Sequence, residues 1–122
     1  MKRFSILFTL LVVLPFSLIA DEAQINLTYK PKQGNHNEYY PPADMPEVYF
    51  DNDNQEIIIV ADGFSAYYDV DIISQSSMIA VISTQVDGYG DSIDISSLPD
   101  DNYTIVITSE FNNVYQGQFT NY

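Results

Sequence analysis

The sequence of 122 residues contains no cysteine and no tryptophan, a single histidine, and only four lysine and arginine residues. The absence of cysteine excludes a disulfide framework, a thiolate zinc site, a cysteine nucleophile and a lipid anchor attached to cysteine. Seventeen acidic residues give a formal net charge of −13. Nucleic acids and anionic lipids are recognised through clustered lysine and arginine, so this charge argues against both as partners.

Hydrophobic residues make up 46% of the chain, which is too many for a disordered protein. Alternation of apolar and polar residues predicts strands, most clearly over 66–72, 103–108 and 115–120. A shorter strand is expected over 25–29, and the β-branched residues 57–60 predict a strand buried on both faces. Turn signals about every 8–12 residues complete the pattern of an all-β, immunoglobulin-like antiparallel sandwich of about seven strands with Greek-key connections.

The first twenty residues have the pattern of a secretory signal peptide. Lys2 and Arg3 precede an uncharged run over 4–20, and the small residue Ala20 is followed at once by acidic residues. The run is short for a membrane span of about 20 residues, although an uncleaved anchor is the alternative. Cleavage near Ala20 would place the rest of the chain in the periplasm, on the cell surface or in the medium. It would leave two basic against 17 acidic residues, a net charge of −15.

The chain is thus expected to have three parts. The signal peptide covers 1–20, and 21–45 is an extended, partly flexible segment rich in proline, glycine and asparagine. The sandwich is expected over 46–122, with no membrane contact after the signal peptide is removed. One histidine, His36, lies in the extended segment, where a solvated loop side chain is the simplest interpretation.

A short motif between two alternating segments predicts a tyrosine corner. Leu98 and Pro99 form a turn that leads to Tyr103 at the start of a strand. In such a corner the phenol hydroxyl donates to a backbone carbonyl a few residues upstream and holds a Greek-key crossover in place. A plain turn followed by an ordinary core tyrosine is the alternative.

The chain also resembles a known family, on segments that fall in the family's order and spacing: 46–51, 57–60, 68–72, 93–99 and 102–105. This family is the set of small secreted bacterial proteins catalogued as domain of unknown function 3244. The resemblance covers most of residues 25–120. It implies one immunoglobulin-like sandwich behind a signal peptide, at the cell surface or in the periplasm, with no established activity and no functional residues to carry over. C-terminal sorting domains share the Leu-Pro…Tyr ending, but they usually finish on a basic strand, and Val114–Tyr122 contains no lysine or arginine.

The best metal candidate is the acidic segment that contains Asp51, Asp53 and Glu56. Oxygen ligands at alternate positions suit calcium, which is the one cofactor that the sequence suggests. The segment lacks the length and central glycine of an EF-hand loop. A polar hairpin turn is the alternative, because aspartate and asparagine favour turns for backbone reasons.

The tyrosines suggest a binding face. In an alternating strand Tyr68 points inward, so Tyr67 points outward beside Asp69 and Asp71, and Tyr89 lies in a later turn. An exposed ring beside carboxylates suits stacking on a sugar or contact with a protein. The alternative is ordinary β-propensity, since tyrosine fits a half-exposed strand.

The sequence contains no nucleophile elbow, no paired-histidine metal motif and no phosphate-binding glycine loop. The leading hypothesis is therefore a non-enzymatic interaction or adhesion module whose partner is a protein or glycan at the cell surface. A small carbohydrate-binding module, with or without calcium, is the second hypothesis. A hydrolase that uses two carboxylates is the third.

Overall fold

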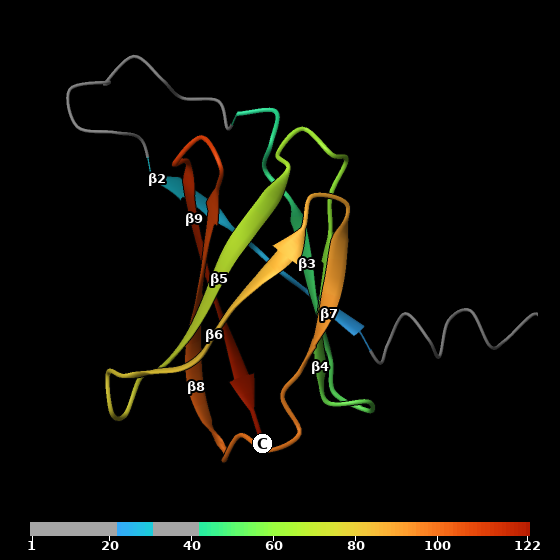
Figure 1. The fold of residues 1–122 in the computed structure, drawn as a ribbon. Helices are drawn as coiled ribbons and strands as arrows, with labels where there is room; N and C mark the ends of the chain where they lie inside the picture. Colours follow the sequence, from blue (N-terminus) through green and yellow to red (C-terminus); the bar gives the residue numbers. More distant parts are fainter. Residues whose placement is uncertain (1–21, 31–41) are drawn as a thin grey trace, which may run out of the picture.

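The computed structural model describes residues 22–30 and 42–122, which form two antiparallel sheets packed face to face (Figure 1). The four-stranded sheet has the order β1-β3-β4-β7 and the five-stranded sheet the order β2-β9-β8-β5-β6. The strands are β1 (Glu22–Ile25), β2 (Thr28–Lys30), β3 (Glu47–Asp51), β4 (Glu56–Val60), β5 (Tyr67–Ser74), β6 (Ala80–Asp87), β7 (Gly90–Asp94), β8 (Asp101–Ser109) and β9 (Val114–Asn121). Within these residues there is no helix, and so none that could cross a membrane. The all-β immunoglobulin-like prediction is confirmed.

Alternation along the strands builds the core between the sheets. In β5, Tyr68, Val70 and Ile72 are buried while Tyr67 and Asp69 face solvent, as the sequence predicts. The core is completed by apolar side chains from both sheets: Ile25, Val48, Ile57, Ile59, Val86, Ile93, Ile95, Tyr103, Ile105, Ile107, Tyr115 and Phe119. Because this interior is almost entirely β-branched or aromatic, each strand presents side chains that favour a pleated surface.

The prediction that residues 57–60 are buried on both faces is wrong. Ile57 and Ile59 are buried, whereas Ile58 is half-buried and Val60 is 45% exposed. The outer face of the four-stranded sheet has no second layer within the described residues, so one side of β4 stays open to solvent, as is usual in antiparallel sandwiches.

The N-terminal segment differs most from expectation. The seven strands β3–β9 correspond to the sandwich predicted over 46–122, but the strand predicted over 25–29 is two strands in different sheets. β1 pairs with β3, and β2 pairs with β9. The boundary at residue 46 is therefore too late, because residues 22–30 extend both sheets.

A glycine allows this crossing from one sheet to the other. A Cβ atom on Gly117 would lie 2.7 Å from Ile25 Cγ2 and 3.0 Å from the carbonyl oxygen of Asn26. No side chain larger than hydrogen fits there without movement of the crossing segment. The alternation of 115–120 thus has a glycine at an inward position because the backbone of residues 26–27 passes directly over it.

At the connection between β7 and β8, the Tyr103 hydroxyl donates to the carbonyl oxygen of Pro99. The Tyr103 ring is fully buried and stacks on Phe119 with centroids 5.4 Å apart, and Leu98 packs against the core. This is the geometry of a tyrosine corner, placed where the chain passes from β7 in one sheet to β8 in the other.

Candidate functional site

Three of the predicted binding residues share the outer face of β5. Tyr67 is 36% exposed, and Asp69 and Asp71 follow it at the alternate positions of the strand. Both carboxylates accept hydrogen bonds from the neighbouring edge strand β6: Gln85 Nε2 donates to Asp69 over 3.0 Å and Ser83 Oγ donates to Asp71 over 2.6 Å. These carboxylates therefore support the sheet surface and are already partly satisfied.

The fourth predicted residue, Tyr89, lies in the turn between β6 and β7. Tyr67 is the register partner of Asp87, and the backbone N–H of Tyr89 donates to Asp87 Oδ1 over 3.3 Å. Tyr89 is 71% exposed. Its ring lies directly over Gly63, where a Cβ atom would approach the ring to 2.7 Å and where φ is +85°. Tyr67 and Tyr89 thus lie at the same end of the sandwich, whereas Asp69 and Asp71 lie progressively farther along β5, opposite Gln85 and Ser83.

Hydrogen bonds join the β4–β5 loop to the β8–β9 turn at this end. The buried Ser65 hydroxyl donates to the carbonyl oxygen of Tyr67 over 2.5 Å and accepts from the N–H of Glu110 over 3.0 Å. The Glu110 carboxylate in turn accepts from the N–H of Ala66 over 2.6 Å. Two connections that lie 45 positions apart in the sequence therefore form one unit.

Backbone hydrogen bonds attach the β6–β7 turn to the same loop. The N–H of Gly63 donates to the carbonyl oxygen of Gly88, and the N–H of Gly88 donates to that of Ala66, both over 3.0 Å. The N–H of Ala61 donates to the carbonyl oxygen of Tyr89 over 3.2 Å. Three connections are therefore held in a fixed arrangement.

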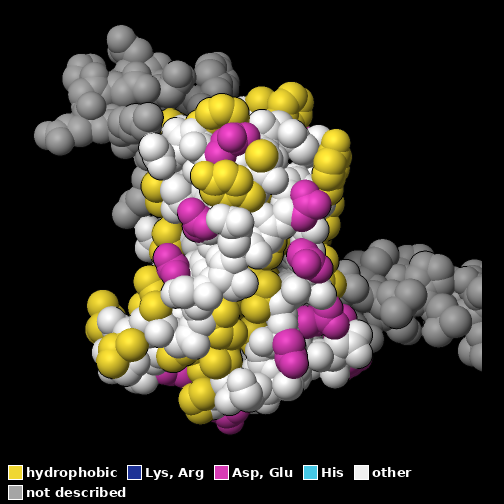
Figure 2. All heavy atoms as spheres, viewed as in Figure 1, with side chains coloured by type: hydrophobic (Ala, Val, Ile, Leu, Met, Phe, Trp, Pro, Cys, Tyr) yellow, Lys and Arg dark blue, Asp and Glu magenta, His cyan; other side chains and the backbone are white. Residues whose placement is uncertain are grey.

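This arrangement displays four aromatic side chains, Phe64, Tyr67, Tyr89 and Phe111, which we call the aromatic end. Phe64 is 58% exposed and Phe111 is 55% exposed. Figure 2 shows hydrophobic side chains gathered at this end of the sandwich, over the tips of the β4–β5 loop and the β6–β7 turn, with acidic side chains between them. Phe64 and Phe111 were not among the predicted site residues. Their signal in the sequence is a large aromatic residue inside a turn segment, next to glycine or asparagine.

The predicted metal loop is a hairpin turn. Asp51 is 5% exposed, and its carboxylate accepts from the N–H and the side-chain amide of Asn54 over 3.2 and 2.8 Å. Asp51 and Glu56 are register partners at the base of the hairpin, whereas Asp53 is exposed at its tip. No group of three or more histidine, aspartate or glutamate side chains that could hold a metal ion occurs in the part of the chain that the structure describes. The structure does not assemble the predicted set, because the carboxylate of Asp51 closes the turn.

A buried carboxylate that the sequence did not single out lies beneath the aromatic end. Asp44 is 4% exposed and accepts from the Tyr115 hydroxyl and from Asn113 Nδ2, the latter over 3.2 and 3.3 Å to its two oxygens. The Tyr68 hydroxyl donates to the carbonyl oxygen of Asp44 over 2.7 Å. Burial, followed by the nearby negative charge of Asp44, raises the pKa of Tyr68 to about 12. Burial and the bond to Asp44 also raise the pKa of Tyr115 well above its usual range. These phenols therefore act as neutral donors that hold residues 42–46 across the end of the sandwich.

His36 lies outside the described residues.

No protein-family model matches the chain, and no curated protein has significant similarity to it. Among solved structures, the chain is similar to the crystal structure of a DUF3244 family protein with an immunoglobulin-like β-sandwich fold from Bacteroides vulgatus. The TM-score is 0.64 at 15% sequence identity, and the match covers 83% of this chain and 99% of that chain. The comparison indicates no catalytic family. At this identity the likeness is one of fold, and it agrees with the family resemblance inferred from the sequence: the chain has the fold of a DUF3244 immunoglobulin-like domain.

Proposed function

We propose that this protein acts outside the cytoplasm as a non-enzymatic binding module, in surface interaction or adhesion, and that the aromatic end is its contact surface. One observation carries the proposal: three connections held together by hydrogen bonds display Phe64, Tyr89 and Phe111 beside Tyr67 at the start of β5, on a strongly acidic protein. The signal-peptide pattern of residues 1–20 supports the location.

The energetic reason lies in the combination of exposure and order. Exposed aromatic rings lose contact with water when a partner covers them, and phenylalanine and tyrosine are enriched in protein interfaces for this reason. A surface that is already ordered before binding loses little conformational entropy on association. The backbone bonds of Gly63 and Gly88 and the side-chain bonds of Ser65 and Glu110 provide that order.

The partner that fits this surface is a protein with an apolar patch bordered by lysine or arginine. Asp62 in the β4–β5 loop and Asp87 at the end of β6 are both exposed at this end, so they would repel an acidic partner and attract a basic one. A sugar bound to Tyr67, Asp69 and Asp71 is less well supported, because both carboxylates already accept bonds from β6.

Photo-cross-linking tests this proposal. Benzoylphenylalanine is placed at Phe64 or Phe111 and, as a matched control, at Ile79, which is 63% exposed at the opposite end of β5. The labelled proteins are irradiated on the cells that produce the protein. We expect positions 64 and 111 to give a cross-linked adduct with one defined protein. An excess of the unlabelled parent protein should suppress this adduct, whereas an excess of the unlabelled Tyr89→Ser variant should not. Equal adducts from position 79, or none from 64 and 111, would overturn the proposal.

A further inference from the structure

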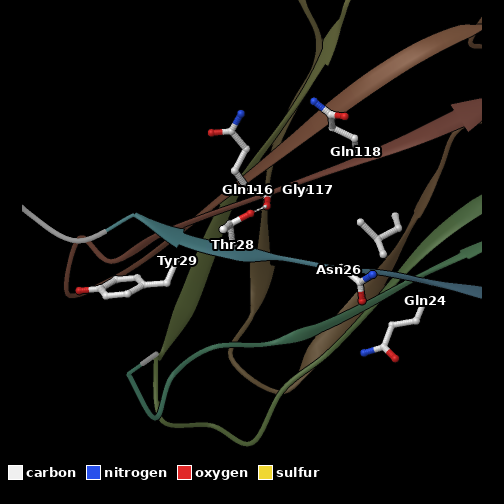
Figure 3. A pocket seen from close by; sticks show the side chains of 8 residues that line it. Gln24, Asn26, Thr28, Tyr29, Gln116, Gly117 and Gln118 are labelled. Atoms are coloured by element: carbon white, nitrogen blue, oxygen red, sulfur yellow. Dashed lines mark hydrogen bonds between the residues drawn. The ribbon is translucent and has the colours of Figure 1, made fainter. Parts of the chain in front are cut away.

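A second surface lies at the other edge of the five-stranded sheet, where the N-terminal segment crosses from β1 to β2. There an open groove of about 770 Å³ is bounded by β1, β2 and β9. Figure 3 shows Gln116 and Gln118 on one side of the groove and Gln24 and Asn26 on the other, with Thr28 between them. The Thr28 hydroxyl donates to the carbonyl oxygen of Gln116 over 3.3 Å, which joins the two sides.

The four carboxamide groups of this groove are unusual within the molecule because their side chains make no hydrogen bond to any described residue. Among the other asparagine and glutamine residues that the structure describes, every side chain except that of Asn112 in the β8–β9 turn is hydrogen-bonded. The bonded set consists of Asn52, Asn54, Gln55, Gln75, Gln85, Asn102, Asn113 and Asn121. The unbonded amides are therefore concentrated at one place, where their donors and acceptors are available to a ligand.

The chemistry of the lining defines the ligand class. None of the described side chains that line the groove is charged, although the protein carries a net charge of −13. Each carboxamide offers two N–H donors and one carbonyl acceptor, and the hydroxyl of Thr28 offers one donor and accepts as well. Sugar hydroxyls also donate and accept at the same atom, so a neutral sugar can satisfy both functions of each amide. The negative field of the protein disfavours an anionic ligand.

A peptide fits the groove less well than a sugar. Strand addition requires a free sheet edge and apolar pockets for alternate side chains. The groove lacks such pockets, because the apolar side chains that line it are Ile25, which is buried, and Tyr29, whose ring packs against Tyr115 with centroids 5.7 Å apart.

We propose that the groove formed by Gln24, Asn26, Thr28, Gln116 and Gln118 binds a neutral saccharide through its side-chain amides. The site is separate from the aromatic end and does not depend on it. The cross-linking experiment above and the binding experiment below therefore fail or succeed independently.

The test uses the protein in the form that the producing cell retains after any N-terminal processing. It is screened on an array of neutral and acidic glycans and against an extended uncharged decapeptide. Bound neutral glycans are then titrated while the side-chain amide signals are followed by nuclear magnetic resonance. We expect the NH₂ signals of the four groove amides to shift and that of Asn112, the unbonded amide outside the groove, to stay in place.

Three variants sharpen the result. Gln116→Ala with Gln118→Ala should weaken binding at least about tenfold, since two side chains that donate and accept are lost. Gln118→Glu keeps the size but removes the donors, and should also weaken binding while thermal unfolding is unchanged. Asn112→Gly, at a residue whose φ is +66°, is the control and should bind as the parent does. Binding that survives the groove variants, preference for acidic glycans or the peptide, or no binding to any neutral glycan would overturn the proposal.

Discussion

The hydroxyl of Tyr115 donates a hydrogen bond to the carboxylate of Asp44, although the two residues lie 71 positions apart in the chain. Both are buried, and the amide of Asn113 donates to the same carboxylate. A buried carboxylate that loses a donor keeps its desolvation cost. The pair therefore holds residues 42–46 against the turn that carries Phe111, and so supports the aromatic end from below.

Tyr115→Phe removes one donor to this carboxylate and leaves the ring in place. We expect the free energy of unfolding, measured by urea denaturation, to fall by about 1–3 kcal/mol. Tyr29→Phe is the matched control, because Tyr29 packs against Tyr115 and its hydroxyl bonds to no described residue. Equal effects of the two substitutions would contradict the role given to Asp44.

The crossing over Gly117 predicts a second effect. Gly117→Ala places a methyl group 2.7 Å from Ile25 Cγ2 and 3.0 Å from the carbonyl oxygen of Asn26, so the crossing segment must move. We expect a loss of about 1–3 kcal/mol in the free energy of unfolding, with faster hydrogen exchange in β2. Gln118→Ala, at the next and exposed position of β9, is the control and should leave the free energy of unfolding and the exchange rate in β2 nearly unchanged. If Gly117→Ala also leaves them unchanged, the crossing segment does not lie as close to Gly117 as the structure has it.

Stability below neutral pH should depend on Asp101. Hydrogen bonds from the hydroxyls of Ser74 and Ser76, and from the N–H of Asn102, lower the pKa of this carboxyl to about 2. The value in the unfolded chain is about 3.9. The ionised form is therefore favoured by folding, so its contribution is complete above about pH 4 and is lost as the pH falls toward 2.

Asp101→Asn should remove this contribution, so the stability difference between parent and variant should shrink as the pH falls from 6 to 2. Asp100→Asn, whose carboxyl makes no hydrogen bond to a described residue, is the control. Chemical denaturation at a series of pH values measures both. A parent–variant difference that stays constant over this range would show that these bonds do not favour the ionised form.

Tyr103→Phe tests the tyrosine corner. The variant loses the bond to the carbonyl oxygen of Pro99 but keeps the ring that stacks on Phe119. We expect a loss of roughly 1 kcal/mol in the free energy of unfolding. Tyr122→Phe, at a side chain that is 87% exposed, should be neutral. A neutral Tyr103→Phe would mean that the hydroxyl adds nothing to the crossover.

The signal-peptide prediction has a direct check. Intact mass spectrometry of the protein recovered from outside the cytoplasm should show an N-terminus at Asp21, after Ala20. A mass that corresponds to a chain beginning at Met1 would instead support an uncleaved membrane anchor.

Local patterns were sufficient for much of the fold. The alternation around Tyr68, Val70 and Ile72 predicted the inward face of β5 because the side-chain period of a strand is two whatever the strand packs against. The turn at Leu98 and Pro99 predicted the corner at Tyr103, since the donor and its acceptor lie four positions apart. The same periodicity predicted that Tyr67 points outward and Tyr68 points inward.

Only the tertiary structure decided which distant turns meet and which polar groups are buried or left unbonded. Phe64 and Phe111 share one end because Ser65 bonds to Glu110 across 45 positions, and Asp44 is buried because Tyr115 reaches it across 71. The N-terminal segment divides between two sheets because Gly117 leaves room for the crossing. The sequence by itself determined the β-class of the fold, the inward face of β5, the corner at Tyr103 and the acidic character of the protein. The aromatic end and the amide groove depend on long-range packing between connections, which no local period specifies.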